Sequence, residues 1–327
     1  MRSVLVRLLA VALLATAPAG ARSSGVNQTA QINGREYVRL SDWARANGLQ
    51  MGWLKREENL QLSNSGTKLY LTVDSREASL NGVQIWLSFP VASRNGTVFL
   101  SQLDLQTTLQ PLLSPPKNQR FVLIRSVCLD PGHGGKDPGY RVGSREEKRY
   151  TLLLAQEVRE QLNRAGLKAS LTRTTDSFVE LPTRPDLAKR RSADLFVSLH
   201  FNAFSTPVQG AEVYCLTPAG APSTNVQGEG GNESWRAGNR NNERSVFLAY
   251  QVQKSLTRTL GVEDRGVRRA RYAVLRDAAM PAVLIEGGFM SHPIEGRKIF
   301  DAAYRRQMAK AIVDGLLAYK RTVEQRS

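Results

Sequence analysis

Long apolar runs and cysteines are both scarce in this sequence. After the first 21 residues, no stretch approaches the ~20 apolar residues that a membrane-spanning helix requires, so we expect no integral membrane segment. The only cysteines, Cys128 and Cys215, lie inside apolar runs that are typical of strands. An exported pair can form a disulfide, but a buried free cysteine packs as a small hydrophobic residue. We therefore expect both cysteines to stay free.

Acidic residues are fewer than basic ones, 29 against 45, which gives a formal net charge of +16 at pH 7. Such a surface attracts polyanions: an anionic membrane surface, an acidic cell-wall polymer or nucleic acid. Arg2 and Arg7 accompany a short apolar run that ends in Ala19-Gly20-Ala21, the A-x-A pattern of a secretory cleavage site. We expect residues 1–21 to be a signal peptide and the protein to be exported to the periplasm or cell envelope, which argues against nucleic acid as its partner.

Residues 26–113 have the pattern of a small α+β domain. Asn33-Gly34 and Asn95-Gly96 are turn signals, and each precedes an apolar strand and a serine, Ser41 or Ser101, that can cap a helix. This repeated pattern resembles the N-terminal modules of copper amine oxidases, which are appended to exported bacterial proteins. Copper is not implied, because this stretch has no histidine or cysteine. Its role is either binding or that of a spacer.

A polar, proline-rich break at residues 114–119 predicts a linker, and residues 120–321 a second domain. In this domain apolar strands alternate with amphipathic helices, which predicts an α/β fold with a mostly parallel central sheet flanked by helices. Open sheets of this kind bind ligands at the carboxyl ends of their strands. Residues at those ends are therefore the first candidates for a functional site.

Three strand ends carry ionisable side chains. A strand at 122–129 leads into a turn rich in glycine and proline that presents His133, a second strand ends at His200, and a third ends at Glu286. Glu147 begins a predicted helix. Two imidazoles and a carboxylate are a plausible set of zinc ligands with one open position for water. The chain has only three histidines, and packing gives no reason for two of them to follow apolar strands. The third, His292, precedes Pro293 as a helix N-cap does.

Four segments, residues 129–139, 147–148, 198–203 and 281–289, resemble in order the motifs of zinc-dependent N-acetylmuramoyl-L-alanine amidases of the Amidase_3 type. The resemblance implies a peptidoglycan hydrolase that cleaves the amide between N-acetylmuramic acid and the L-alanine of the stem peptide. By position it implies His133, Glu147 and His200 as Zn²⁺ ligands and Glu286 as the group that transfers protons. Glu147, rather than its neighbour Glu146, fits the register of the family's helix.

Other functions and features stay open. A zinc peptidase acting within the stem peptide is one alternative, and a non-catalytic wall-binding relative is another, although none of the four residues is missing. The sequence does not identify an activator protein. Residues 265–269 also match the family, either lining the cleft or in structural pairs. The polar segment 216–244 is expected to be a mobile loop at the rim of the site.

Overall fold

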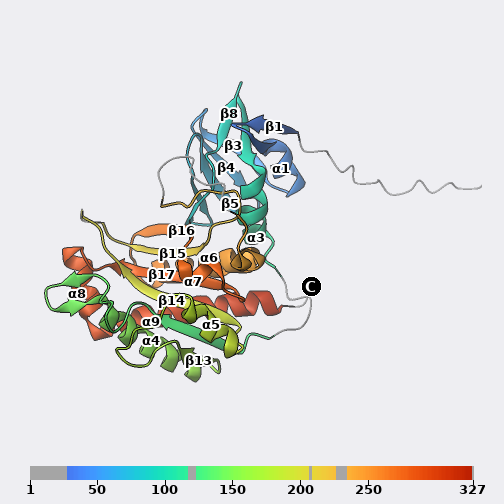
Figure 1. Ribbon diagram of the computed structural model, residues 1–327. Helices are drawn as coiled ribbons and strands as arrows, with labels where there is room; N and C mark the ends of the chain where they lie inside the picture. The colour runs from blue at the N-terminus through green and yellow to red at the C-terminus, as the bar shows by residue number, and fades with distance from the viewer. Residues whose placement is uncertain (1–27, 117–122, 206–207, 226–233, 326–327) are drawn as a thin grey trace, which may run out of the picture.

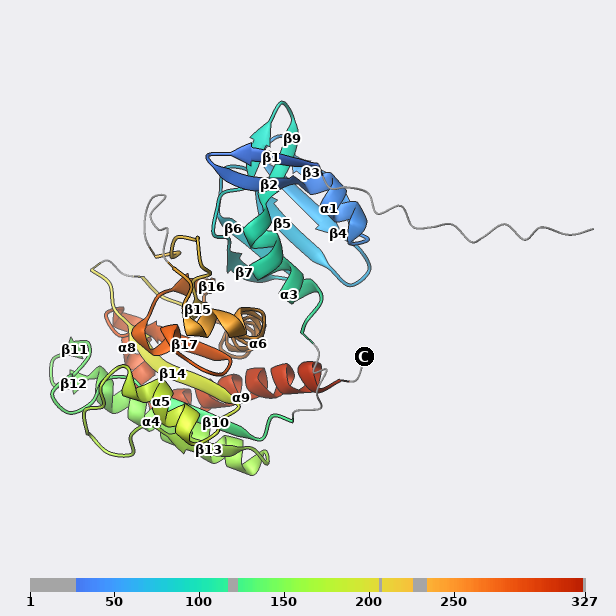
Figure 2. The same ribbon diagram turned by 45° about the vertical axis from the view of Figure 1, so that its right-hand side comes forward.

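The computed structural model describes residues 28–116, 123–205, 208–225 and 234–325 (Figure 1). The expected signal peptide and residues 117–119 of the expected linker lie outside these residues. We refer to residues 28–116 as the N-terminal region and to the described residues from 123 onward as the C-terminal region. Figure 2 shows the N-terminal region above the C-terminal region.

The N-terminal region is built from short antiparallel strands. A four-stranded sheet has the order β1-β2-β9-β8, with bounds Thr29–Ile32, Arg35–Arg39, Thr97–Ser101 and Ala92–Arg94. A meander adds β3 to β7, with bounds Gln50–Lys55, Asn59–Ser63, Lys68–Thr72, Glu77–Leu80 and Val83–Trp86. The helical segments are α1 (Leu40–Ala46), α2 (Gln102–Asp104), a π-helical turn (Leu105–Leu109) and α3 (Gln110–Leu113).

The expected turns are confirmed and one of the two expected caps is not. Asn33-Gly34 and Asn95-Gly96 both have positive φ at both residues, as the tight hairpin turn requires. Ser101 caps its helix, because its side chain accepts a hydrogen bond from the amide of Asp104. Ser41 does not cap, since α1 already begins at Leu40.

The C-terminal region has the predicted mostly parallel sheet flanked by helices, with one antiparallel pair, β15 with β17. Its strands have the order β13-β10-β14-β17-β15-β16, with bounds Lys168–Leu171, Ser126–Pro131, Leu195–Asn202, Ala282–Phe289, Ala211–Leu216 and Asp264–Ala270. The helices are α4 (Glu147–Arg164), α5 (Thr183–Arg190), α6 (Asn242–Leu260), α7 (Ala273–Arg276), α8 (Pro293–Phe300) and α9 (Ala302–Glu324). Successive strand residues such as Phe196 and Val197 enter different hydrophobic clusters, because side chains alternate between the two faces.

The direction of each strand determines which of its two ends lies at the side of the sheet that holds the site. β13, β10, β14 and β17 are parallel, so their carboxyl ends share one edge. β15 runs antiparallel to β17, with Glu212 opposite Glu286 and Tyr214 opposite Leu284. Leu216 therefore lies towards the opposite edge, and the segment that follows it does not begin at the rim of the site. The expectation of a mobile rim loop was wrong for its first residues, since Ala221 and Ser223 are buried.

The two regions share one eleven-stranded sheet, because β7 pairs in parallel with β16 through Ile85 and Val267. Figure 1 shows β16 as the C-terminal strand nearest to the N-terminal region. The indole of Trp86 donates to the carbonyl of Arg265 at 3.1 Å. Arg269 is buried and donates to the carbonyl of Thr107 at 2.7 Å. Removing the N-terminal region would uncover the edge of β16 and leave Arg269 without this acceptor.

The two cysteines are too far apart to be bridged. Cys128 lies on β10 and Cys215 on β15, with β14 and β17 between them. Three inter-strand spacings amount to about 14 Å, whereas bridged cysteines have Cα atoms less than about 7 Å apart. Both thiols are buried and free, as expected.

Within the described ranges, no helix combines the length and the apolar character that crossing a membrane requires.

Candidate metal and active site

The structure brings the four predicted residues to one edge of the sheet. β10 and β14 are adjacent and parallel, so the turn after Pro131 presents His133 beside His200 near the end of β14. β17 pairs with β14 on its other side and places Glu286 opposite His200 in register. The two imidazole rings meet edge to face, with 4.8 Å between their centroids.

Glu147 completes the cluster as the first residue of α4. Its Oε1 lies 3.0 Å from His133 Nε2 and 3.1 Å from His200 Nδ1. One ligand atom from each of the three residues lies within 4.8 Å of the others, and the described part of the chain holds no second group of this kind. Glu146 points elsewhere and pairs with Arg141 and Lys148.

Hydrogen bonds fix the orientation of these side chains. Asp137 Oδ2 lies 2.8 Å from His133 Nδ1, which leaves Nε2 of that ring directed at Glu147. Glu147 Oε2 accepts from the amide of Tyr140. Burial opposes ionisation of Glu147, but its hydrogen bonds to His133 and His200 outweigh burial and hold its pKa far below the usual range. The cluster therefore contains an ionised carboxylate between two oriented imidazoles.

Two buried arginines hold the turn that carries His133. Arg184 pairs with the fully buried Asp130 at 3.0 Å and donates to the carbonyls of Pro131 and His133. Arg173 donates to the carbonyls of Pro131 and Gly132. Asp130 accepts hydrogen bonds from Arg184, Thr172 and Ser198. These bonds stabilise His133 at a positive φ of 61°, which L residues rarely adopt.

Two glycines are required for close packing around the cluster. A Cβ atom on Gly132 would lie 2.2 Å from Cε1 of His200, and one on Gly139 would lie 2.6 Å from Oε2 of Glu147. No real Cβ contact is that short. The glycines of this turn therefore allow the backbone to approach the imidazole and the carboxylate directly.

Glu286 is buried beside this cluster without a compensating partner. Its Oε2 has no hydrogen-bond partner among the described residues. Burial raises the pKa of Glu286 well above its usual range, and the negative charges of Glu147 and Glu212 raise it further. An unpaired carboxyl of this kind is suited to exchanging a proton.

Glu212, which sequence reasoning missed, lies next to Glu286 on β15. Its carboxylate accepts from Asn202 at 2.7 Å and from Arg268 at 3.0 Å. Arg265 pairs with the same carboxylate at 3.2 Å. Of the two roles considered for residues 265–269, structural pairing is therefore the one that these two arginines have.

A pocket of about 370 Å³ adjoins the cluster. His133, Glu147, His200 and Glu286 line one part of it, and apolar groups including Leu181, Tyr272 and Val274 line the rest. The third histidine does not take part, because His292 Nδ1 accepts from the amide of Glu295 and caps α8 as predicted.

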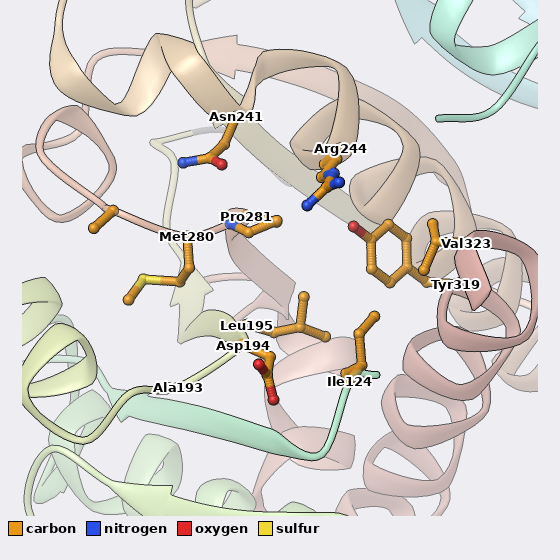
Figure 3. Close-up of a pocket in the computed structure, with 11 residues that line it drawn as sticks. Ile124, Ala193, Asp194, Leu195, Asn241, Arg244, Met280, Pro281, Tyr319 and Val323 are labelled. Atoms are coloured by element: carbon orange, nitrogen blue, oxygen red, sulfur yellow. The ribbon is translucent and has the colours of Figure 1, made fainter. Parts of the chain in front are cut away.

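Another cavity, of about 240 Å³, lies where β14 and β17 begin, between Leu195 and Pro281 (Figure 3). Tyr319 and Arg244 direct their polar ends into it, and Ile124 and Val323 form an apolar wall. None of the four predicted site residues lines it. It therefore belongs to the edge of the sheet away from the cluster.

Comparisons with known proteins agree with this geometry. Residues 127–318 match the N-acetylmuramoyl-L-alanine amidase family, and residues 24–123 match the copper amine oxidase N-terminal domain family. An N-acetylmuramoyl-L-alanine amidase of Neisseria meningitidis is 32% identical over 283 residues, covering 79% of this chain and 67% of that protein.

Solved structures are similar over the C-terminal region. An N-acetylmuramoyl-L-alanine amidase of Nostoc punctiforme is 33% identical with a TM-score of 0.50, covering 60% of this chain and 96% of that one. An amidase of Clostridioides difficile, solved in complex with a lipoprotein, is 27% identical with a TM-score of 0.51, covering 61% and 99%.

Proposed function

The chain belongs to the N-acetylmuramoyl-L-alanine amidase family and is a peptidoglycan amidase, and from this premise we propose that it works with a zinc ion held by His133, Glu147 and His200. The observation that supports the proposal is the approach of three ligand atoms to within 4.8 Å of one another. The bond cleaved is the amide between N-acetylmuramic acid and the L-alanine of the stem peptide.

The donor set fits zinc. Two imidazole nitrogens and one carboxylate oxygen are a common ligand set of catalytic zinc, which keeps a fourth position open. The contact of Asp137 with His133 is the kind of outer hydrogen bond that orients a ligating histidine. A zinc ion in such a site polarises a carbonyl and lowers the pKa of water towards ~7.

Glu286 supplies the proton transfer in this proposal. Its carboxylate lines the pocket beside the cluster, makes no hydrogen bond through Oε2 to the described residues, and accepts a proton from the attacking water. The same carboxyl group then gives this proton to the leaving nitrogen of L-alanine, so that the carboxylate is regenerated. The raised pKa of Glu286 makes its carboxylate a stronger base, which favours the first of these steps, the uptake of a proton from water.

The proposal also includes where the protein acts and which partners it has. The secretory pattern at residues 1–21 supports export to the cell envelope, where the peptidoglycan substrate lies. The relative from Clostridioides difficile was solved with a lipoprotein, so an activator protein is a further partner to test when the chain alone turns over slowly.

Product analysis tests the reaction. The purified protein is stripped of metal with a chelator, reloaded with Zn²⁺ and incubated with a soluble muropeptide, and its products are identified by mass spectrometry. We expect free stem peptide beginning with L-alanine, and no turnover before zinc is added. Cleavage within the stem peptide would instead identify a zinc peptidase.

Metal content tests the site independently of the product. We expect His200→Ala to lose the stoichiometric zinc of the wild type. His292→Asn is the matched control, because its side chain caps α8 and asparagine can also cap a helix. Equal zinc content in the two variants would refute the proposed ligand set.

A further inference from the structure

We propose that the boundary between the two regions carries a second binding groove, for an oxyanion-bearing segment of the wall polymer. It lies apart from the amidase pocket and lacks the four site residues. This inference rests on peptidoglycan being the substrate. The groove would hold the polymer while the pocket beside Glu286 acts on it.

The groove consists of two neighbouring cavities. The first, of about 430 Å³, is lined by Arg35, Arg76, Arg94 and Phe89, and by Pro222 from the other region. The second, of about 540 Å³, shares Arg35 and Phe89 with the first and is bordered by Ala219 and Gly220. Each volume lies in the range of small-molecule pockets. Together they extend along residues 219–222 and offer more space than a single small ion fills.

The segment that borders the groove is held in place by both regions. Arg76 of the N-terminal region donates to the carbonyl of Ser223 at 3.4 Å. Thr224 accepts from the amide of Arg269 through its hydroxyl at 3.0 Å, and Thr217 shares a hydrogen bond with Ser223. The groove is thus fixed relative to the sheet that carries the amidase pocket.

Arg76 and Arg94 line the first cavity and have no carboxylate partner among the described residues, whereas Glu36 lines the second cavity. Arg76 bonds only to the carbonyls of Leu87 and Ser223, Arg94 bonds to the carbonyl of Gln31, and neither makes an ion pair among the described residues. Asp74 is the single carboxylate that lines the cavity.

The environment of Arg76 favours an anion. Burial lowers the pKa of Arg76, and the charge of Asp104 only partly offsets this effect. The carboxylate of Asp104 already accepts hydrogen bonds from the amides of Ser88 and Phe89 and from the hydroxyl of Ser101. A partly desolvated cation that lacks its own ion pair is stabilised by a bound anion.

The chemistry of the groove defines its ligand. Guanidinium groups bind carboxylate and phosphate through paired hydrogen bonds. The guanidinium of Arg35 lies 4.3 Å from the centre of the Phe89 ring and is thereby oriented. The carboxylates of the peptidoglycan stem peptide offer this oxyanion chemistry and are the proposed ligand, and the phosphates of another wall polymer are the alternative that the test separates. A second contact to the same polymer raises the effective concentration of substrate at the catalytic pocket.

The test uses the full-length, zinc-loaded protein. We compare Arg76→Gln/Arg94→Gln with Arg45→Gln/Arg56→Gln, a control that removes the same charge from side chains that are 81% and 88% exposed. Cosedimentation with purified sacculi measures binding, and turnover of a small soluble muropeptide measures chemistry. The groove variant should bind sacculi at least ~10-fold more weakly, within the range that a second contact can supply, and keep normal turnover of the small substrate.

Competition then distinguishes the two sources of oxyanion. A soluble stem peptide that displaces the protein from sacculi identifies carboxylate as the group bound, and a poly(glycerol phosphate) identifies phosphate. Arg94→Glu provides a second variant, because this exposed side chain makes one hydrogen bond and its reversal should not affect folding. Sacculus binding of both groove variants equal to that of the control would overturn the proposal. If the wild-type protein does not turn over the small soluble muropeptide, the result counts against the amidase mechanism and not against the groove.

Discussion

The substitution Asp130→Asn tests whether a buried ion pair holds the turn that carries His133. Asp130 is fully buried and pairs with Arg184, whose side chain is only 2% exposed. Breaking a buried pair costs about 3–5 kcal/mol, because the remaining charge is left uncompensated. We expect the lower value, since the hydroxyl of Thr172 can still donate to the asparagine oxygen, and the hydroxyl of Ser198, which lies against the other oxygen of Asp130, can accept from the new amide group. A loss of about 3 kcal/mol corresponds to a fall in Tm of about 4–5 °C, because the entropy of unfolding scales with the 327 residues of the chain.

The assay is thermal unfolding of the metal-free protein, because a bound metal would add its own stabilisation. Zinc affinity is then measured by competition with a chelator. It should fall roughly 10-fold, since Arg184 also donates to the carbonyl of His133 and an outer-shell change of this kind weakens metal binding. Asp314→Asn is the control: its pair with Lys310 is exposed and contributes at most about 1 kcal/mol. Equal melting temperatures for the two variants would refute the reasoning.

Two further substitutions probe the cluster itself. Asp137→Ala removes the partner of His133 Nδ1 and should weaken zinc binding about 10–100-fold, measured by chelator competition; unchanged affinity would mean that the ring is oriented by other contacts. Gly132→Ala should displace His200, because the new Cβ would lie 2.2 Å from its ring, and zinc content should fall while the fold is retained. Gly52→Ala, with no neighbouring atom within 4 Å, is the control, and equal zinc content in both would contradict the packing argument.

The sequence predicted which residues form the site, because the ends of buried strands can be recognised from where apolar runs stop. Apolar runs that stop at His133, His200 and Glu286 place these residues at the carboxyl ends of parallel strands, and adjacent strands bring such ends together. Glu147 could be distinguished from Glu146 only by the register of α4. In the structure Glu147 is buried in the cluster and Glu146 is not.

Other features have no local signal in the sequence. The reversed direction of β15 depends on its pairing with β17, and this pairing places the segment after Leu216 away from the catalytic edge. Arginine is usually exposed to solvent. Arg173 and Arg184 are nevertheless buried, because backbone carbonyls of the His133 turn accept their hydrogen bonds. The continuation of the sheet through Ile85 and Val267 joins residues far apart in the chain. Only the tertiary structure reveals these three arrangements.

The central claim is that Glu286 transfers the proton while His133, Glu147 and His200 hold the metal. Glu286→Gln keeps the shape of the side chain and removes its ability to accept a proton. The decisive measurement is turnover of a soluble muropeptide by this variant, with zinc content determined on the same sample. We predict a rate lower by ~10²–10⁴ with one zinc ion retained per chain. A near-normal rate with zinc retained would contradict the claim, and loss of the zinc would make Glu286 a ligand rather than the proton acceptor.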